Sequence, residues 1–292
     1  MNWRGTQTEK NDAAAAAGAS GDSRISRREA LLRAAALFGT LTFAEGNSLA
    51  NRLDITHHRV SVPYLDRPLR AVQITDLHRS QFVSEAFVGR VVAETNALSP
   101  DIVLLTGDFV TRTSDYAESC MSQLAGLQAP SGKFAVLGNH DYWCDGGEGG
   151  PVIRDWLEQT QIEVLTNRST KLANGLRLVG VDDLVAGVVN YSRSLESVRP
   201  NEPVLVMSHN PRTFPYLCQY NFITLAGHTH GGQLYIPGLS DLYLGKYSRG
   251  WCKERDWPGR MYISRGLGTI HVPMRIASTP ELAVFDLEPE LG

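Results

Sequence analysis

The chain has 292 residues, of which 42% are hydrophobic and 20% are charged, and its formal net charge is −3. This composition is typical of a globular protein, and the length is sufficient for one α/β domain with a sizeable core. The lack of a basic excess argues against nucleic acid as the main partner. None of the four cysteines stands in a CxxC pair, which predicts free or buried thiols and no disulfide framework or zinc finger.

The first 50 residues differ in character from the rest of the chain. Residues 1–23 are small and polar and lack apolar periodicity, which predicts disorder. Arg27 and Arg28 then precede an apolar stretch over 31–44, and this pattern resembles a twin-arginine export signal. The stretch contains Arg33 and is shorter than the ~20 residues that a spanning helix needs.

We therefore expect residues 24–50 to direct export to the periplasm or to associate with a membrane surface. Two alternatives stay open for this segment. It could be an ordinary amphipathic helix, or it could be kept uncleaved and hold the protein at the cytoplasmic face of the inner membrane.

Residues 51–292 alternate short apolar runs with helical patterns, and we interpret them as one catalytic domain. Ser84 is the predicted N-cap of one helix, in which the apolar residues recur at helical spacing. The predicted helices cover residues 84–98, 115–127, 151–160 and 212–219. The predicted strands cover residues 69–75, 101–106, 133–137, 164–165, 176–181, 204–207, 222–225, 261–264 and 282–287. Strands that alternate with helices predict an α/β fold.

Five polar clusters each follow one of the apolar strand-like runs. They are Asp76 with His78, Asp108, Asn139 with His140 and Asp141, His209, and His228 with His230. Because ligand sites of open α/β sheets gather outside the carboxyl ends of the strands, we expect the five clusters to converge. Carboxylates and imidazoles are good ligands for divalent ions such as Mn, Fe or Zn, and the lack of thiolates disfavours a structural zinc site.

Seven of these side chains are candidate metal ligands, namely Asp76, His78, Asp108, Asn139, His209, His228 and His230. Seven ligands are too many for one tetrahedral ion, but they suit two ions that share a carboxylate. His140 then remains beside the ions without binding them.

The ordered motifs DxH, GD, GNHD, a lone His and GHTH resemble those of the calcineurin-like metallophosphoesterase superfamily. The separations of 32 positions from Asp76 to Asp108 and 31 from Asp108 to Asn139 fit this resemblance. The segments GHTHGGQ (227–233) and SRGLG (264–268) are most similar to a bacterial branch of exported or membrane-associated phosphodiesterases.

The resemblance implies a four-layer fold of two mixed β-sheets flanked by helices. It also implies that one ion is held by Asp76, His78, Asp108 and His230, while Asp108 bridges to a second ion that Asn139, His209 and His228 complete. His140 would aid departure of the leaving group. Some relatives split the pyrophosphate of a UDP-diacylglucosamine lipid, so a lipid-linked phosphate ester is one candidate substrate.

We therefore expect a hydrolase that cleaves a phosphodiester or a pyrophosphate, with Asp108 and His140 as catalytic residues. Two cations lower the pKa of a shared water, so that hydroxide can attack, and stabilise charge on the phosphate oxygens. Two alternatives from other classes are a non-catalytic metal-binding module and a membrane-tethered interaction protein on the same fold.

Several other residues have both a functional and a plain structural interpretation. Tyr142 and Trp143 could line the substrate pocket or pack as ordinary aromatics. Arg79 and Arg112 could hold a second phosphate or be solvated surface arginines. Asp141 could orient a neighbouring site residue or form a turn. We interpret His57, His58 and His271 as structural or surface residues, because they lack partner motifs.

Overall fold

The structure is a computed structural model that describes residues 45–236 and 238–290, to which the statements below refer. Most of the predicted export segment lies outside these residues. Its last part, residues 45–50, is helical. Within the described ranges, no helix is both long and apolar enough to cross a membrane.

Two six-stranded β-sheets form the centre of the domain, and both contain parallel and antiparallel pairs. The first has the order β1-β12-β2-β3-β4-β5 and consists of β1 (Asp54–Val62), β12 (Glu281–Pro289), β2 (Leu69–Ile74), β3 (Ile102–Thr106), β4 (Lys133–Val136) and β5 (Glu163–Val164). The second has the order β10-β11-β9-β8-β7-β6 and consists of β10 (Gly250–Lys253), β11 (Arg260–Ile263), β9 (Ile223–Ala226), β8 (Val204–Met207), β7 (Arg177–Gly180) and β6 (Arg168–Lys171).

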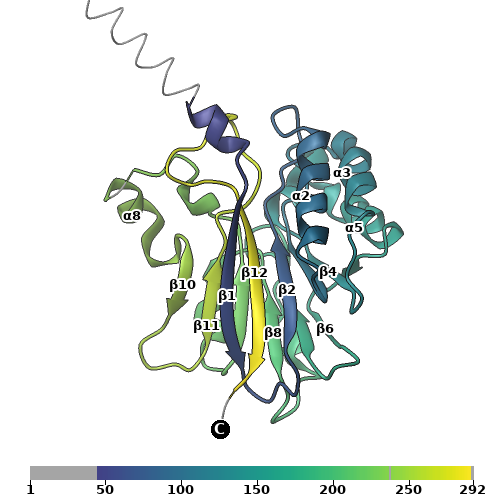
Figure 1. Ribbon diagram of the computed structural model, residues 1–292, viewed down its shortest axis with the longest axis vertical. Helices are drawn as coiled ribbons and strands as arrows, with labels where there is room; N and C mark the ends of the chain where they lie inside the picture. Colours follow the sequence, from purple (N-terminus) through teal and green to yellow (C-terminus); the bar gives the residue numbers. More distant parts are fainter. Residues whose placement is uncertain (1–44, 237, 291–292) are drawn as a thin grey trace, which may run out of the picture. The chain divides into compact units, whose positions relative to one another are not determined.

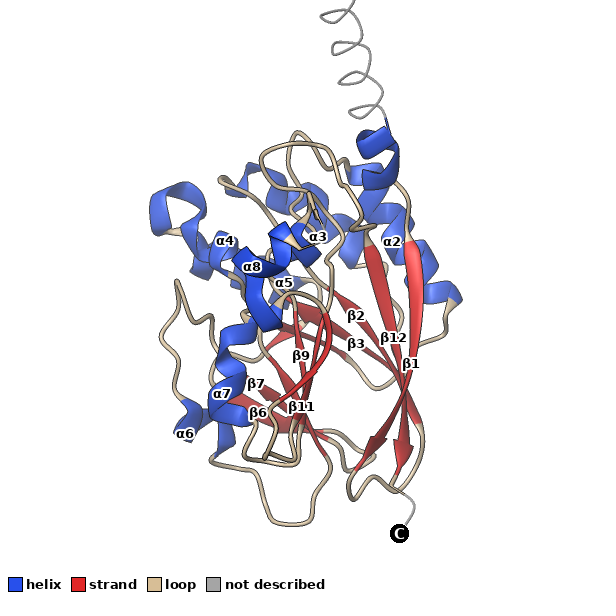
Figure 2. Cartoon of the chain, turned by 90° about the vertical axis from the view of Figure 1, so that its left-hand side faces the viewer, coloured by secondary structure: helices blue, strands red, loops and turns tan. Residues whose placement is uncertain are grey.

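Helices cover the outer faces of the two sheets. The helices are α2 (Glu85–Ala97), α3 (Ala117–Leu124), α4 (Asn139–Trp143), α5 (Gly149–Gln159), α6 (Tyr191–Leu195), α7 (Phe214–Leu217) and α8 (Leu239–Leu244). Short 3₁₀ helices are η1 (Ser114–Tyr116), η2 (Cys144–Gly147), η3 (Pro211–Thr213), η4 (His230–Gly232) and η5 (Gly245–Tyr247). Figure 1 shows α2, α3 and α5 stacked on the first sheet, and Figure 2 shows α6 and α7 beside the second.

The layers are held together by separate apolar clusters. Ala71 and Leu104 of the first sheet pack against Leu205 and Leu225 of the second sheet in the cluster between them. Strand residues of the first sheet that face the other way pack against α2, α3 and α5. The outer face of the second sheet is covered by α6 and α7. This arrangement confirms the predicted fold of two mixed sheets flanked by helices.

The predicted strands and long helices are confirmed, with small shifts at their ends. Ser84 caps α2, because its side chain accepts a hydrogen bond from the backbone N–H of Phe87 at 3.2 Å. The helix predicted over 115–127 is divided into η1 and α3, and the helix predicted over 212–219 into η3 and α7.

Strands β1, β6 and β10 were not predicted from the sequence. Strand β1 pairs in parallel with β12 along the whole of both strands. Figure 1 shows these strands, which lie near opposite ends of the described chain, side by side. Strand β1 is at the edge of its sheet and carries polar residues at many positions, so its apolar pattern is weak. Its partner is more than 200 positions away, and only the folded chain brings the two together.

Candidate metal centre

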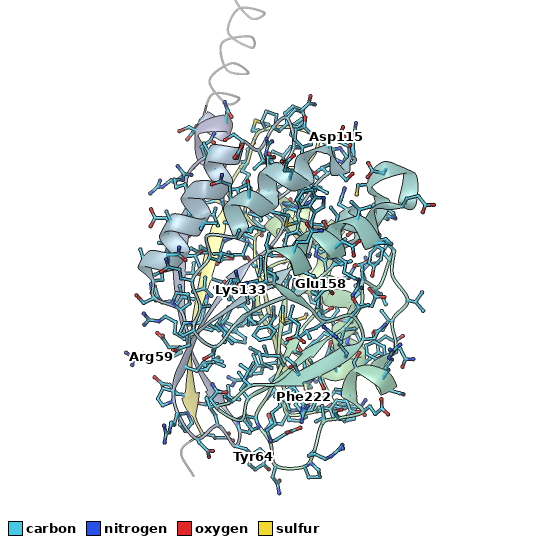
Figure 3. All side chains as sticks on the ribbon, turned by 90° about the vertical axis from the view of Figure 1, so that its right-hand side faces the viewer. Arg59, Tyr64, Asp115, Lys133, Glu158 and Phe222 are labelled. Carbon is cyan, nitrogen blue, oxygen red and sulfur yellow. The ribbon has the colours of Figure 1, made fainter. Side chains whose placement is uncertain are left out.

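The candidate site lies at one rim of both sheets, beyond the carboxyl ends of β2, β3, β4, β8 and β9. Figure 3 gives the orientation of this rim: Asp115, which follows β3, lies at one end of the domain, and Phe222, which precedes β9, lies towards the other. Because the five strands run in the same direction within their sheets, their polar carboxyl-terminal residues meet at one end.

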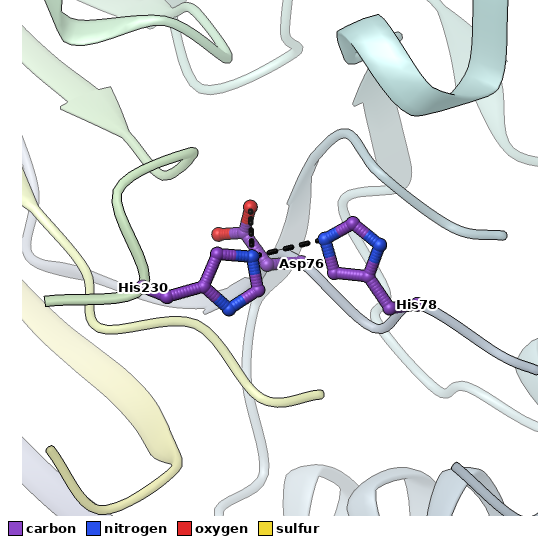
Figure 4. A group of neighbouring side chains, drawn as sticks. All are labelled: Asp76, His78 and His230. Carbon is purple, nitrogen blue, oxygen red and sulfur yellow. Dashed lines mark hydrogen bonds and ion pairs between the residues drawn. The ribbon is translucent and has the colours of Figure 1, made fainter. Parts of the chain in front are cut away.

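The first group of potential ligands is formed by Asp76, His78 and His230 (Figure 4). The Nε2 atoms of His78 and His230 are 2.9 Å apart, and His230 Nε2 is 3.6 Å from Asp76 Oδ1. All three side chains are almost fully buried. They come from the β2 loop and the β9 loop, so both sheets contribute to this group.

The second group is formed by Asp108, His209 and His228, with the amide of Asn139 among them. His209 Nδ1 donates to the carbonyl oxygen of Thr106 at 2.8 Å, which leaves Nε2 of the neutral ring as an acceptor. That nitrogen lies 3.2 Å from Asp108 Oδ2 and 3.1 Å from Asn139 Oδ1. Acceptor atoms facing one another at this distance repel unless a cation lies between them, so the residues present fit a metal ion.

Asp108 connects the two groups. Its Oδ2 atom lies 3.3 Å from Nε2 of His78 and 3.2 Å from Nε2 of His209. Its other oxygen, Oδ1, accepts a hydrogen bond from the backbone N–H of His140 at 2.8 Å. One carboxylate oxygen therefore lies next to ring nitrogens of both groups, so Asp108 could contribute to holding two ions.

The pKa values of the buried groups reflect the concentration of charge. Burial lowers the pKa of His78 to about 3 and that of His228 to about 4, so both imidazoles are neutral at pH 7. Burial also disfavours the charged form of His209, but attraction to Asp108 and to other carboxylates outweighs it and raises the pKa to about 10.

The backbone at the site is held in an unusual conformation. Asp76, His78, Asp108, His228 and His230 all have positive φ angles, between 48° and 73°. Non-glycine residues rarely adopt this left-handed region, because it costs about 1–2 kcal/mol per residue. The surrounding structure must therefore compensate for several strained residues, which is common where side chains are aimed at a functional centre.

Asp141 fixes the loops after β3 and β4 relative to each other. Its buried carboxylate accepts hydrogen bonds from the backbone N–H groups of Asp108 at 2.8 Å, Phe109 at 2.8 Å and Gly138 at 2.9 Å. Gly138 allows this close approach, because a Cβ atom there would lie 2.3 Å from Asp108 Oδ1. Asp141 thus positions Asp108 and the loop of Asn139, which supports the orienting role over that of a simple turn residue.

The glycine-rich segment at 264–268 supports the Asp76 loop from the other side. Gly266 has φ +67°, and a Cβ atom there would lie 2.7 Å from the Cβ of Asp76. The backbone N–H of Gly268 donates to the carbonyl of Asp76. The segment 264–268 therefore holds the loop that carries Asp76 in place.

Two residues that support the ligands, Thr111 and Arg275, were not predicted from the sequence. Thr111 Oγ1 lies 2.8 Å from His78 Nδ1 and orients that ring. Arg275 is fully buried, donates to the backbone carbonyls of Gly268, Arg265 and Ser278, and contacts His230 Nδ1 at 3.3 Å. Neither residue follows a recognisable motif, so no local signal could have identified it.

The remaining candidates have varied surroundings. His140 is half-buried, and its ring lies edge-on to that of His78 at 4.8 Å and to that of the exposed Trp143 at 5.5 Å. The hydroxyl of Tyr142 donates to Asp182 at 2.6 Å. Arg79 donates to the carbonyls of Ser80 and Val83, which occupies Nη1 of its guanidinium. Arg112 is exposed and lines a cavity next to His78.

Two mixed sheets with buried carboxylates and imidazoles gathered at one rim define a metallophosphoesterase. The chain belongs to the calcineurin-like phosphoesterase family, whose sequence profile matches residues 69–232. Membership implies divalent metal ions as cofactors and hydrolysis of phosphoesters as the general activity.

Several bacterial proteins are similar to this chain. An uncharacterized metallophosphoesterase of Aquifex aeolicus is 30% identical over 227 residues, covering 75% of this chain and 85% of that protein. The uncharacterized metallophosphoesterase YkuE of Bacillus subtilis is 28% identical and covers 91% of this chain and 98% of its own length. The UDP-2,3-diacylglucosamine pyrophosphatase LpxG of Chlamydia muridarum is 27% identical and covers 74% of this chain and 83% of its own.

Proposed function

We propose that this protein is a binuclear metal-dependent phosphoesterase that hydrolyses a phosphodiester or a pyrophosphate bond. The observation that carries the proposal is the position of Asp108 Oδ2, which lies within 3.3 Å of the ring nitrogens of His78 and His209 in the two ligand groups. In this proposal Asp76, His78, Asp108 and His230 hold one ion, and Asp108, Asn139, His209 and His228 hold the other.

When bound, the two ions activate water and stabilise negative charge on the phosphate oxygens. The chain's own residues supply the rest of the chemistry. His140 is held beside the centre by the hydrogen bond from its backbone N–H to Asp108, and its ring is half-buried next to His78. It is therefore suited to donate a hydrogen bond or a proton to the leaving oxygen.

A diester or pyrophosphate is favoured over a monoester by two observations. The similarity to a pyrophosphatase covers 74% of this chain, and that protein acts on UDP-2,3-diacylglucosamine. A cavity beside the centre also leaves room for a substrate that continues past the scissile phosphate. A lipid-linked pyrophosphate is thus one candidate substrate, and residues 24–50 are our proposed export or membrane-association segment.

The test combines metal analysis with a panel of substrates. We expect about two divalent ions per chain after reconstitution with Mn, Fe or Zn, and metal-dependent hydrolysis of a chromogenic diester and of a pyrophosphate diester, with the chromogenic monoester slowest. Asp108→Ala should lose metal and reduce kcat by at least about 10³-fold, because both ions lose a ligand. Asp115→Ala, which removes an exposed carboxylate outside the ligand groups, is the matched control.

Three outcomes would reject parts of the proposal. Binding of two ions without hydrolysis of any phosphoester would favour a non-catalytic metal-binding module. Full metal content and full activity of Asp108→Ala would exclude the bridging role. A clear preference for the monoester would reverse the assignment of substrate class.

A further inference from the structure

A cavity of about 390 Å³ adjoins the first ligand group and is lined by residues outside the proposed ligand set. Its wall includes Phe82, Thr111, Arg112, Tyr116 and His271. Thr111 connects the cavity with the centre, because its hydroxyl lies 2.8 Å from Nδ1 of His78. The ring of His78 therefore lies between this wall of the cavity and the first ligand group, because its Nε2 atom faces His230.

The cavity presents positive charge without a balancing carboxylate. The described lining residues include Arg112 and His271 but no Asp or Glu. Within residues 45–236 and 238–290, the guanidinium of Arg112 forms no hydrogen bond or ion pair.

Arg112 differs in this respect from Arg79, the other arginine next to the centre. Arg79 donates to the backbone carbonyls of Ser80 and Val83, and its guanidinium stacks 4.8 Å above the ring of Tyr116. Arg79 therefore builds the wall of the cavity, whereas Arg112 keeps its donors free. The backbone of Arg112 is fixed, because its carbonyl accepts a hydrogen bond from the N–H of Asp145 at 3.0 Å.

We infer that this cavity binds a second phosphate of the substrate, one bridging oxygen beyond the scissile phosphorus, with Arg112 as its main partner. The planar guanidinium offers paired donors that match phosphate oxygens. This inference rests on the proposed function and narrows it to pyrophosphate diesters. Water is added across the P–O–P bridge: its oxygen bonds to one phosphorus, the bridging oxygen leaves with the other, and both products are phosphate monoesters.

The experiment compares two substrates that differ by one phosphate, bis(4-nitrophenyl) phosphate and P1,P2-bis(4-nitrophenyl) pyrophosphate, with products separated by chromatography. We expect Arg112→Ala to raise KM for the pyrophosphate at least tenfold more than KM for the single phosphate. Arg112→Lys should recover part of the loss, because it retains the charge but not the fork of donors. Arg193→Ala, at an exposed arginine on α6, is the matched control and should behave as the wild type.

A binding arm separates failure of this inference from failure of the proposed function. Calorimetry on the metal-loaded protein would compare the bis(4-nitrophenyl) ester of methylenebisphosphonate with a 4-nitrophenyl monophosphonate. Arg112→Ala should weaken the first roughly tenfold more than the second, whether or not turnover occurs. Equal effects on both ligands, or no effect on either, would overturn the assignment of Arg112 and the cavity, even if diester hydrolysis is robust.

Discussion

Asp141 offers the sharpest test of how the fold positions the centre. Its carboxylate is fully buried and accepts three short hydrogen bonds, from the backbone N–H groups of Asp108, Phe109 and Gly138. Asp141→Ala would leave these three donors buried and unpaired, each at a cost of about 1–3 kcal/mol. Burial and the nearby Asp108 raise the pKa of Asp141, because both disfavour its ionised form. Keeping this carboxylate ionised therefore costs free energy in the wild type, and Asp141→Ala removes that cost.

Together the three donors would cost about 3–9 kcal/mol, and the avoided cost of the buried carboxylate places the expected loss in the free energy of unfolding near the lower end, at about 4 kcal/mol. For a domain of this size it corresponds to a fall in Tm of roughly 8–16 °C. The assay is thermal and urea unfolding in the presence of a chelator, so that loss of metal does not contribute. Metal affinity, measured separately, should also fall, because the Asp108 and Asn139 loops lose their common anchor.

Asp101→Ala is the matched control for this prediction. Asp101 also accepts a hydrogen bond from a backbone N–H, that of Arg70 at 2.7 Å, but it is only half-buried and accepts a single such bond. We expect a loss of about 1 kcal/mol, or roughly 2–4 °C in Tm. If Asp141→Ala were no less stable than Asp101→Ala, the three amides would have other partners and Asp141 would not join the loops.

Three further perturbations test separate contacts. Thr111→Val should weaken the binding of one metal ion roughly 10–100-fold in a competition titration, because His78 loses the hydrogen-bond partner of its Nδ1 atom. Thr160→Val is the control: the hydroxyl of Thr160 donates to a carbonyl at the end of α5, so its loss should leave metal affinity unchanged. Gly266→Ala should reduce metal content, because the added Cβ would displace Asp76. Gly175→Ala is the control: Gly175 has φ +91° but open space around the added Cβ, so the substitution should cost only about 1–2 kcal/mol of stability. Equal metal content in the two variants would show that the contact between Gly266 and Asp76 is unimportant. Burial raises the pKa of Glu281, but Arg265 and hydrogen-bond donors that include Tyr262 outweigh burial and lower this pKa below its ordinary value of 4.5. The ionised carboxylate of Glu281 therefore stabilises the fold above pH 4.5, and this contribution is lost as the pH falls below that value. Glu281→Gln should therefore be less stable than the wild type by about 2 kcal/mol at pH 7, with a gap that narrows below pH 4.5, and a gap independent of pH would refute the ionic role of Glu281.

The sequence by itself determined much of the central architecture. The runs that became β2, β3, β4, β8 and β9 are almost entirely buried, so their residues are mainly apolar and the runs were easy to recognise. The polar residues directly after these runs were conspicuous for the same reason. Because parallel strands place their carboxyl ends at one edge, this local pattern was enough to predict that Asp76, Asp108 and His209 would meet.

Only the tertiary structure decided which contacts orient these residues. Arg275 and Thr111 touch His230 and His78 from segments 45 and 33 positions away, and neither belongs to a motif. The cavity beside His78 likewise joins residues 80–82, 111–116 and 269–271, which have no common signal in the sequence. Such contacts depend on how loops pack after the sheets have formed, whereas burial of a strand leaves a pattern in the strand's own residues.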